Sequence, residues 1–505
     1  MVRVRFAPSP TGPLHIGGVR TALYNYLFAR HHGGTMVLRI EDTDSKRFVP
    51  GAEDYIVESL RWLGIEIDEG IGCDVQPYGP YRQSERRDIY RKYVQQLLDA
   101  GRAYYAFDTA EELEEVRARI PNFSYDAATR GQMNNSLSLT PDEVRAKLES
   151  GVPYVVRFLV EPGREVEVND LIRGSVVINS TQLDDKVLYK SSDDLPTYHL
   201  ANIVDDHLMK ITHVIRGEEW LPSAPLHVLL YEAFGWADTM PRFAHLSLIL
   251  KPQGSGKLSK RDGDRLGFPV YPLEWTDPDT GAVSSGYREQ GYLPEAVVNF
   301  LALLGWNPGT DQEFFENFQD LANSFTLERC SKAGARFDYE KAKWFNHQYI
   351  RVEPVERLVE VVLPLLNRIG ITPEPQKLAA VINVVRDKVQ LIPDFVDETA
   401  YFFRAPQDFD SNGVKKHWKP ETPQYLMRML SLLRSLSGTN PSPEQIEQAL
   451  YDEINQNDLP MGKVMNGMRL ALVGAARGPR LHEIIALLGV DESIRRVEYA
   501  ISHLK

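Results

Sequence analysis

The sequence predicts an α/β fold followed by an all-α part, on the strength of three observations. Residues 2–7 and 36–40 carry β-branched and apolar side chains in the short runs that are typical of strands. The segment between these two runs has apolar residues at helical spacing, so a strand, a helix and a strand follow one another. Beyond about residue 346 the apolar residues recur every three or four positions, which predicts helices.

Local patterns define further elements along the chain. Thr109 followed by Glu112 is a capping-box pattern, which predicts the start of a charged helix. Residues 152–179 alternate as strands do, and residues 267–286 form a long stretch rich in Pro, Gly and Asp, to which we assign no function. In the C-terminal part we expect helices at residues 350–366, 375–396 and 445–454.

The net charge of the chain is −13, from 57 basic and 70 acidic residues. Because phosphate contacts dominate the affinity of proteins for nucleic acids, any such contact has to use local basic clusters. Each of these clusters is by itself more typical of a solvated surface than of a binding site. The clusters lie at residues 82–87, 415–419, 428–434 and 495–496.

Composition also bounds the cellular compartment. The 505 residues are enough for several domains, and the two cysteines, Cys73 and Cys330, provide no disulfide framework. No apolar run approaches the roughly 18 residues of a membrane span, so we expect no contact with a membrane. The first motif begins at residue 5, which leaves no room for a cleavable targeting segment. We therefore expect a cytoplasmic protein.

The loop after the first predicted strand has the pattern of a phosphate-binding turn. Three prolines and Gly12 within residues 8–13 exclude regular structure, and a helix is expected from Gly17 onward. Gly17 and Gly18 lack Cβ atoms, and free N–H groups in the first helical turn favour a phosphate. His15 precedes this turn and offers a further hydrogen bond. Taken alone, the pattern is more often only a surface turn.

Charged residues follow the first two predicted strands. Glu41, Asp42 and Asp44 follow residues 36–40, and Arg5 lies near the end of the first strand. Ligands bind at the carboxyl ends of strands in open α/β sheets. Arg5 suits the carboxylate of an α-amino acid, and Glu41 suits its ammonium group. The alternative is a solvated acidic turn, which is the commoner role for such a cluster.

A second basic loop, Lys-Leu-Ser-Lys-Arg, occupies residues 257–261 after a flexible Gly- and Ser-containing segment. Three cations this close repel one another unless an anion joins them. On a mobile loop, Lys257 and Lys260 can neutralise charge that develops on the α-phosphate of ATP and on the leaving pyrophosphate. Residues 15–18 and 257–261 together, which we name the phosphate clamp, predict a nucleotide held from two sides.

Eight motifs in order resemble bacterial glutamyl-tRNA synthetases, which are class I aminoacyl-tRNA synthetases. The resemblance is dense over residues 1 to about 350 and looser beyond. The motifs are RFAPSPTG at 5–12, HIGG at 15–18, RIEDTD at 39–44, GPYRQSER at 79–86, PTYHLAN at 196–202, VDDH at 204–207, VIRGEEW at 214–220 and KLSKR at 257–261.

The resemblance implies four regions. A Rossmann-type, doubly wound catalytic domain would comprise residues 1–105 and 195–245. An α+β domain that binds the acceptor end of tRNA would be inserted at residues 106–194. A connector that contacts the tRNA stem and carries the basic loop would span residues 246–345, and helical anticodon-binding domains would span residues 346–505, with terminal helices at 463–472 and 481–488.

The implied reaction is the ATP-dependent attachment of L-glutamate to the 3′ end of its tRNA through a glutamyl-adenylate, with release of pyrophosphate and AMP. Arg216 would hold the side-chain carboxylate, because its planar fork matches that group. The glutaminyl relatives lack Arg at this position, so Arg216 favours glutamate over glutamine. The implied glutamate pocket is Arg5, Ala7, Ser9, Glu41, Tyr198, Asn202 and Arg216.

The resemblance also implies a site for ATP, with Mg²⁺ carried by the phosphates of ATP and not by a dedicated protein site. The implied catalytic residues are His15, Gly17, Lys257 and Lys260. The implied ATP-binding residues are His15, Gly17, Gly18, Glu219, Trp220, Leu250, Lys257 and Lys260. Some relatives hold zinc with a cysteine cluster. Because this chain has only two cysteines, we expect no structural zinc and no protein-bound metal.

The implied partners are the glutamate tRNA and, as an alternative, the glutamine tRNA as well. The family expectation is a monomer, and Arg386 and Lys388 on a helix would read the anticodon. Three other functions remain open: a tRNA-modifying glutamyl paralogue, another adenylyl transferase, and an inactive tRNA-binding paralogue. The first is shorter and carries zinc cysteines, the second would lack the pocket around Arg216, and the third would lack His15 or the two lysines.

Overall fold

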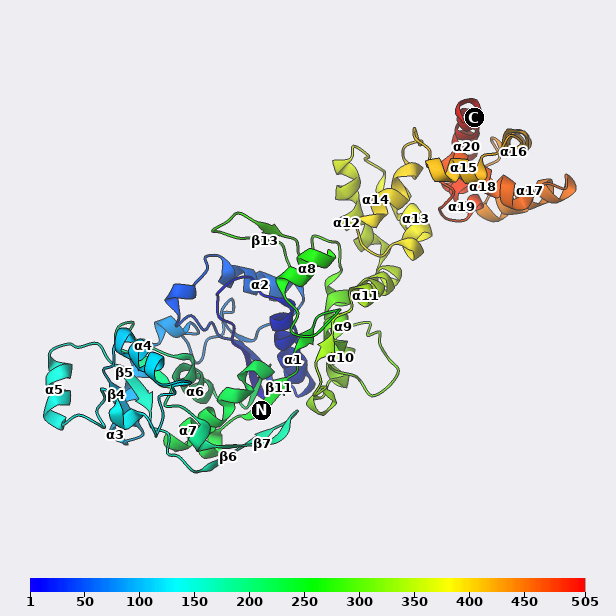
Figure 1. The fold of residues 1–505 in the computed structure, drawn as a ribbon. Helices are drawn as coiled ribbons and strands as arrows, with labels where there is room; N and C mark the ends of the chain where they lie inside the picture. The colour runs from blue at the N-terminus through cyan, green and yellow to red at the C-terminus, as the bar shows by residue number, and fades with distance from the viewer. Residues whose placement is uncertain (505) are drawn as a thin grey trace. The chain divides into compact units, whose positions relative to one another are not determined.

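The structure, a computed structural model, describes residues 1–504 and divides into two compact units (Figure 1). The first unit comprises residues 1–289 and 297–339, and the second comprises residues 290–296 and 340–504. The first unit combines sheets with helices, and the second is built of helices. The predicted fold class, α/β followed by an all-α part, is therefore confirmed.

The centre of the first unit is a parallel sheet assembled from distant parts of the chain. Strands β1, β2 and β3 pair in that order, and β10 pairs with β11. The N–H of Thr212 donates to the carbonyl of Arg3 at 2.9 Å, so β1 and β10 lie side by side. The strands are β1 (Arg3–Phe6), β2 (Thr35–Leu38), β3 (Glu69–Gly70), β10 (His213–Gly217) and β11 (Arg242–Leu246).

Helices connect these strands, and the sequence predicts the first of them, α1. Helix α1 is mostly buried, and Nδ2 of its Asn25 donates to the carbonyl of Ile215 at 3.0 Å, which fixes α1 against β10. The amphipathic α2 and α3 each bury one face, as the spacing of their apolar residues requires. The helices are α1 (Ile16–His31), α2 (Ala52–Trp62), α3 (Arg87–Asp99), α6 (Tyr198–Leu208) and α7 (Ala224–Ala233).

The region between the two halves of the sheet forms an antiparallel sheet with the order β4-β5-β8-β9. Helix α4 starts with the predicted capping box between Thr109 and Glu112. The strands predicted at 152–179 exist, but β6 and β7 belong to the other sheet, because β6 pairs with β11. The elements are β4 (Ala103–Ala106), α4 (Ala110–Arg119), α5 (Pro141–Glu149), β5 (Val155–Phe158), β6 (Glu165–Asp170), β7 (Gly174–Asn179), β8 (Val187–Lys190) and β9 (Leu195–Pro196).

The rest of the first unit carries the basic loop. Within the stretch 267–286, β13 and β14 form a short antiparallel hairpin. The carbonyl of Val270 accepts the N–H of Ile16 at 3.0 Å, which joins this stretch to the start of α1. The elements are β12 (Ile249–Leu250), α8 (Lys260–Leu266), β13 (Trp275–Thr276), β14 (Val283–Ser284), α9 (Pro294–Leu303), α10 (Phe318–Ser324) and β15 (Ala335–Arg336).

Two helices predicted in the second unit differ from those in the structure. The helix expected at 350–366 is two helices separated at Pro354, because proline cannot continue a helix from the preceding turn. The helix expected at 375–396 ends at Val385 and is followed by a 3₁₀ turn, Arg386–Lys388, before α14. The helices are α11 (Tyr339–Val352), α12 (Val355–Arg368), α13 (Pro375–Val385), α14 (Asp394–Thr399), α15 (Ser411–His417), α16 (Thr422–Leu436), α17 (Pro443–Gln456), α18 (Met461–Val473), α19 (Leu481–Leu488) and α20 (Val490–His503).

The helices predicted at 445–454, 463–472 and 481–488 are confirmed as α17, α18 and α19. Over residues 1–504, no helix is both long enough and apolar enough to cross a bilayer.

Candidate active site

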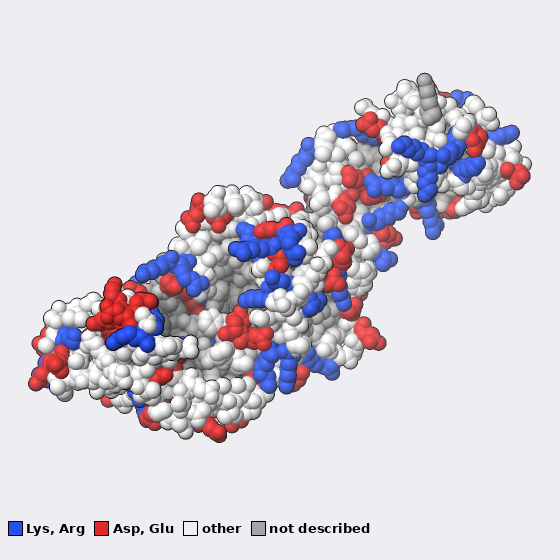
Figure 2. Space-filling model, in the orientation of Figure 1, with Lys and Arg blue, Asp and Glu red and all other residues white. Residues whose placement is uncertain are grey.

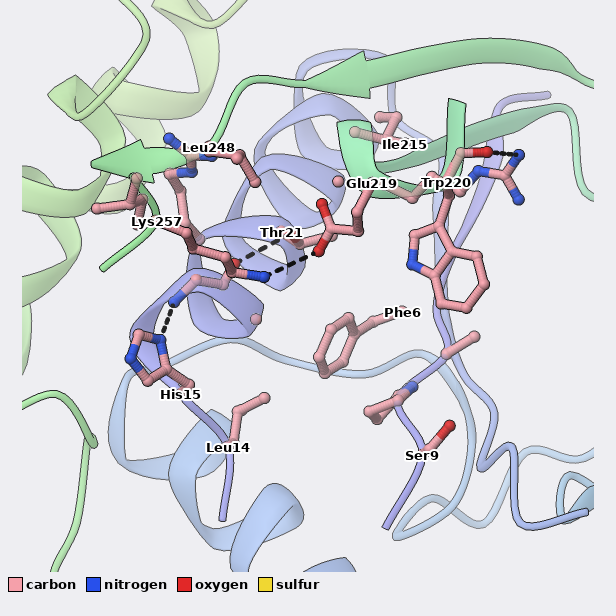
Figure 3. Close-up of a pocket in the computed structure, with 18 of the residues that line it drawn as sticks. Phe6, Ser9, Leu14, His15, Thr21, Ile215, Glu219, Trp220, Leu248 and Lys257 are labelled. Carbon is pink, nitrogen blue, oxygen red and sulfur yellow. Dashed lines mark hydrogen bonds and ion pairs between the residues drawn. The ribbon is translucent and has the colours of Figure 1, made fainter. Parts of the chain in front are cut away.

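A cavity of about 370 Å³ lies at the carboxyl ends of β1, β10 and β11 (Figure 3). Its volume is in the range of small-molecule sites, and its place is the one expected for ligands of open α/β sheets. Figure 3 shows His15 and Lys257 on one side of the cavity and Trp220 on the other. The predicted site residues that line it are Arg5, Ala7, Ser9, His15, Gly17, Gly18, Glu41, Tyr198, Arg216, Glu219, Trp220 and Lys257.

Three residues predicted to bind glutamate or ATP are not in the cavity wall. Leu250 is replaced there by its neighbour Ile249, because successive residues of a strand point to opposite faces. Lys260 is the first residue of α8 and lies beside the wall residue Ser259. Asn202 is buried in α6, and its Nδ2 has no hydrogen-bond partner among the described residues.

His15 caps α1 and offers one donor. Its Nδ1 accepts the N–H of Gly17 at 3.2 Å, so the ring proton is on Nε2. This Nε2 is buried and has no partner within residues 1–504. Burial, and secondarily the charge of Lys257, lowers the pKa of His15 to about 4, so the ring is neutral at pH 7. His15 therefore presents an unused N–H.

The expectation that the first turn of α1 leaves free N–H groups is wrong. The N–H of Ile16 donates to Val270, that of Gly17 to Nδ1 of His15, and that of Gly18 to the carbonyl of His15. The reason is the capping by His15 and the approach of the 267–286 stretch. The helix start keeps its dipole and its two glycines, but the donor for an anion is the imidazole.

The second half of the phosphate clamp reaches the same cavity. Lys251 and Gly256 close a tight turn through an N–H to carbonyl bond of 3.1 Å, which brings Lys257 back beside Leu250. Nζ of Lys257 then lies 3.2 Å from Oε1 of Glu219, and the two side chains are 57% and 46% exposed. This exposed pair holds the lysine at the cavity only weakly.

A buried charge network supports the opposite end of the cavity. Nε of Arg5 lies 3.2 Å from Oδ1 of Asp206. Arg39 bridges this carboxylate, at 2.8 Å, to that of Glu41, at 3.0 Å. Burial alone would raise the pKa of Asp206, but the guanidinium groups of Arg5 and Arg39 outweigh it and lower that pKa. Burial raises the pKa of Glu41 against the effect of Arg39.

Sequence reasoning assigned no role to Arg39, Asp205 or Asp206. The signal that could have found them is the pair of adjacent acids at 205–206 on a helix with otherwise apolar neighbours. Asp205 accepts from Nε of Arg86 at 2.8 Å and from the hydroxyl of Tyr90 at 2.8 Å. These residues hold Arg5 and Glu41 in fixed orientations toward the cavity.

Arg216 is a buried cation without a carboxylate. It is 5% exposed, and within residues 1–504 no Asp or Glu oxygen lies within 4.0 Å of its guanidinium. Nε donates to Nε2 of His245 at 3.0 Å, and Nη1 donates to the hydroxyl of Tyr198 at 2.7 Å. Nη2 has only long contacts, to the carbonyl of Trp220 at 3.5 Å and to Nδ1 of His227 at 3.4 Å. The cavity therefore contains an uncompensated guanidinium with spare donors.

Arg20 is the other buried arginine of the wall that makes no ion pair with a described residue, but its surroundings are different. Its two terminal nitrogens donate to the backbone carbonyls of Leu304, at 2.7 Å, and Ser247. Arg20 thus holds the backbone at the back of the cavity, and of these two arginines Arg216 is the one with terminal N–H groups left for an anionic ligand.

The chain is similar to known proteins over its whole length. A family described as "tRNA synthetases class I (E and Q), catalytic domain" matches residues 1–344, and one described as "Anticodon binding domain" matches residues 357–501. The glutamate–tRNA ligase of Porphyromonas gingivalis is 63% identical over 503 residues, which cover 100% of this chain and 99% of that protein. The chain belongs to the glutamate–tRNA ligase family.

Two further relatives support the assignment to this family. The glutamate–tRNA ligase of Phocaeicola vulgatus is 60% identical and is covered to 99%, against 100% of this chain. A crystal structure of a glutamate tRNA ligase from Elizabethkingia meningosepticum, in complex with its amino acid, superposes with a TM-score of 0.94 at 49% identity, with each chain covered to 100%. The resemblance to class I synthetases is thereby confirmed.

Two other predicted residues lie in the second unit. Arg386 and Lys388 are in the 3₁₀ turn after α13 and not on the helix where they were expected. Arg386 donates to the carbonyls of Ile350, at 2.7 Å, and Glu353, and Lys388 donates to that of Gly478.

In the described part of the chain, no group of three or more His, Cys, Asp or Glu side chains is arranged to hold a metal ion.

Proposed function

We propose that the chain attaches L-glutamate to the 3′ end of a tRNA in two steps. In the first, a carboxylate oxygen of glutamate attacks the α-phosphorus of ATP, the bond to pyrophosphate breaks, and glutamyl-adenylate forms. In the second, a hydroxyl of the terminal ribose attacks the glutamyl carbonyl carbon and AMP leaves. Membership of the glutamate–tRNA ligase family supports this reaction, and the buried, unpaired guanidinium of Arg216 is the observation that carries the choice of amino acid.

Glutamate would lie with its side-chain carboxylate on Arg216 and Tyr198. Its ammonium group would meet the carboxylate of Glu41, and its α-carboxylate would lie toward Arg5. The loop residues Ala7 and Ser9 line the cavity, and Asn202, whose Nδ2 has no hydrogen-bond partner among the described residues, would complete the pocket. Each charged group of the amino acid then meets a protein group of opposite charge, and this compensates for the hydration that the charge loses on entering the cavity.

The same guanidinium explains how glutamine would be rejected. A carboxamide brings no charge to Arg216, and its NH₂ group would face donors of Arg216. The buried cation would stay uncompensated, which costs far more than the loss of one ordinary hydrogen bond.

ATP would lie between the two halves of the phosphate clamp. His15 would donate its free Nε2–H to a phosphate oxygen, and Lys257 and Lys260 would neutralise charge on the phosphates as pyrophosphate leaves. Gly17 and Gly18 would allow close approach to the helix start, and adenine would lie near Trp220 and Glu219, which also line the cavity. No protein nucleophile is needed, because positioning and charge stabilisation carry such transfers. Mg²⁺ would arrive with ATP, held by its phosphates.

The tRNA contacts would be divided along the chain. Residues 106–194 would bind the acceptor end, 246–345 would contact the stem, and 346–505 would read the anticodon, including Arg386 and Lys388. On the face shown in Figure 2, Lys and Arg gather over α15, which carries Lys415 and Lys416. Local basic surface of this kind is what a chain with a net charge of −13 needs for a polyanion. The substrate would be the glutamate tRNA, with the glutamine tRNA as a second candidate, and the protein would act as a cytoplasmic monomer.

The test is Arg216→Ala in tRNA-dependent pyrophosphate exchange. We expect the KM for glutamate to rise at least about 100-fold, because a charge-assisted fork is lost, while the KM for ATP stays within about twofold. Arg242→Ala is the matched control, since Arg242 is an exposed arginine at the other end of the neighbouring strand β11. An unchanged KM for glutamate would show that the pocket is assigned wrongly.

A second measurement separates charging of the 3′ end from modification of a tRNA base. Transfer of labelled glutamate to tRNA that lacks its terminal adenosine should fall to background. Transfer that persists on this shortened tRNA would favour the tRNA-modifying paralogue.

A further inference from the structure

Three side chains on neighbouring strands form a line that ends at the cavity. Arg216 on β10 and His245 on β11 are register partners of two parallel strands, so their side chains lie on the same face of the sheet. Asp170 ends β6, which joins the far side of β11 at Phe243. The exposed fractions of Asp170, His245 and Arg216 are 5%, 0% and 5%. Only Arg216 borders the cavity.

The hydrogen bonds of this line have a fixed direction. A guanidinium only donates, so Nε2 of His245, at 3.0 Å from Nε of Arg216, must accept. The ring proton is therefore on Nδ1, which donates to Oδ2 of Asp170 at 2.6 Å. Burial, opposed by Asp170 and reinforced by Arg216, lowers the pKa of His245, in keeping with a neutral ring. A proton on Nε2 would instead face the Nε–H of Arg216.

Asp170 is itself held in one orientation. Its Oδ1 accepts the N–H groups of Ile172 and Arg173 at 2.9 and 2.8 Å. The other oxygen, Oδ2, accepts the backbone N–H of His245 at 3.1 Å and faces Nδ1 of the same residue's imidazole. The orientation of the carboxylate is fixed by the turn after β6, and the orientation of the ring follows from it.

The consequence reaches the ligand side of Arg216. With Nε bound to His245 and Nη1 bound to Tyr198, the guanidinium cannot rotate about its own plane without losing two hydrogen bonds. A carboxylate can then approach only at the terminal nitrogens, because the edge through Nε is closed. The direction of the fork is set by a residue that lies outside the cavity wall.

We propose that His245, oriented by Asp170, is a positioning residue that directs the Arg216 fork at the substrate's side-chain carboxylate and thereby sets the preference for glutamate over glutamine. This rests on the proposed function, in which Arg216 receives that carboxylate. Glutamine makes no charge-assisted pair with the guanidinium of Arg216. Disorder of this guanidinium therefore weakens the binding of glutamate more than the binding of glutamine.

Asp170→Asn tests the hydrogen bonds from Asp170 through His245 to Arg216, because the substitution leaves the shape of the side chain almost unchanged. Because the backbone N–H groups keep an oxygen at the Oδ1 position, the new NH₂ faces Nδ1 of His245. The ring proton then moves to Nε2 and meets the Nε–H of Arg216. We expect the kcat/KM for glutamate to fall about 10- to 100-fold, the KM for ATP to change less than about twofold, and the ratio of glutamate to glutamine activation to fall.

His245→Leu and His245→Gln separate positioning from packing. Leucine removes the acceptor and should raise the KM for glutamate as Asp170→Asn does. Glutamine places Oε1 near the position of Nε2, where it can accept from Arg216, so it should recover most of the lost kcat/KM. His213→Gln is the matched control, since His213 lies on the same strand as Arg216 but at its far end, packed against Phe28. It should leave glutamate and glutamine kinetics unchanged.

The double variant Asp170→Asn/His245→Leu should be no worse than His245→Leu alone, because both changes act through one bond to Arg216. Unchanged glutamate kinetics in Asp170→Asn, or equal loss in His245→Gln and His245→Leu together with a raised KM for ATP, would overturn the inference. If His245→Leu does not fold, Asp170→Asn decides alone. Arg216→Ala separates failure of the positioning role from failure of the proposed function. If Arg216→Ala also leaves the KM for glutamate unchanged, the proposed function fails. If Arg216→Ala is the one variant that raises this KM, only the positioning role of His245 fails.

Discussion

Replacing Lys257 with alanine tests the basic loop of the phosphate clamp. Among the described residues, Nζ of Lys257 has one partner, the carboxylate of Glu219 at 3.2 Å, and the two side chains are 57% and 46% exposed. Such exposed pairs contribute about 0.2–1 kcal/mol to stability, so Lys257→Ala should unfold at nearly the same temperature as the parent protein.

The effect on catalysis should be much larger. A charge-assisted hydrogen bond to a phosphate is worth about 1.5–3 kcal/mol, which corresponds to a factor of about 10 to 150 in kcat/KM for ATP. The assay is pyrophosphate exchange at saturating glutamate and tRNA. The loss should be greater in kcat than in the KM for ATP, since the charge on pyrophosphate develops in the transition state.

Lys251→Ala is the matched control. Lys251 lies in the same turn, pairs with Asp262 at 3.6 Å and does not line the cavity. It should lose less than about twofold in kcat/KM for ATP. Equal losses in the two variants, or no loss in Lys257→Ala, would refute the assignment of the loop to the phosphates.

The remaining predictions concern the helix start, the ammonium site and pH. Gly17→Ala should fold normally, because the nearest atom to the new Cβ is Nδ1 of His15 at 3.6 Å, but its methyl group enters the cavity and should raise the KM for ATP; an unchanged KM would contradict close approach of phosphate. Glu41→Gln should raise the KM for glutamate about tenfold and leave that for ATP unchanged, whereas parallel changes in both would indicate a structural defect. Burial lowers the pKa values of His15, His199 and His213 to about 4, so the unfolded chain, with histidine pKa values near 6.5, binds more protons between these limits. The stability is therefore complete above about pH 6.5 and is lost as pH falls toward 4, and denaturant unfolding that is equally stable at about pH 7 and about pH 5 would contradict this.

The parts of the fold that were predictable are those encoded locally. The run from β1 through the proline-rich loop to α1 and β2 follows from periodicity and from loop-forming residues within about 40 positions. The capping box at Thr109 is likewise a local pattern. The break between α11 and α12 was also visible as Pro354, but the apolar spacing on either side of it concealed the end of one helix and the start of the next.

The parts that were not predictable depend on which distant segments meet. The N–H of Ile16 is occupied by a carbonyl of the 267–286 stretch, and nothing near Ile16 in the sequence indicates this. The bond between Arg216 and His245 arises from strand register, which periodicity alone does not define. The buried pair of Arg39 with Asp206 was hidden because these two residues are far apart in the sequence, although both lie in motifs that carry the family resemblance.

The central claim is that the guanidinium of Arg216, buried and without a carboxylate of its own, selects a carboxylate side chain. The most direct test is the ratio of kcat/KM for L-glutamate to that for L-glutamine in tRNA-dependent pyrophosphate exchange by the unmodified protein. We expect glutamate to be preferred by at least about a thousandfold, with the preference collapsing in Arg216→Ala. Comparable activation of the two amino acids by the unmodified protein would contradict the claim.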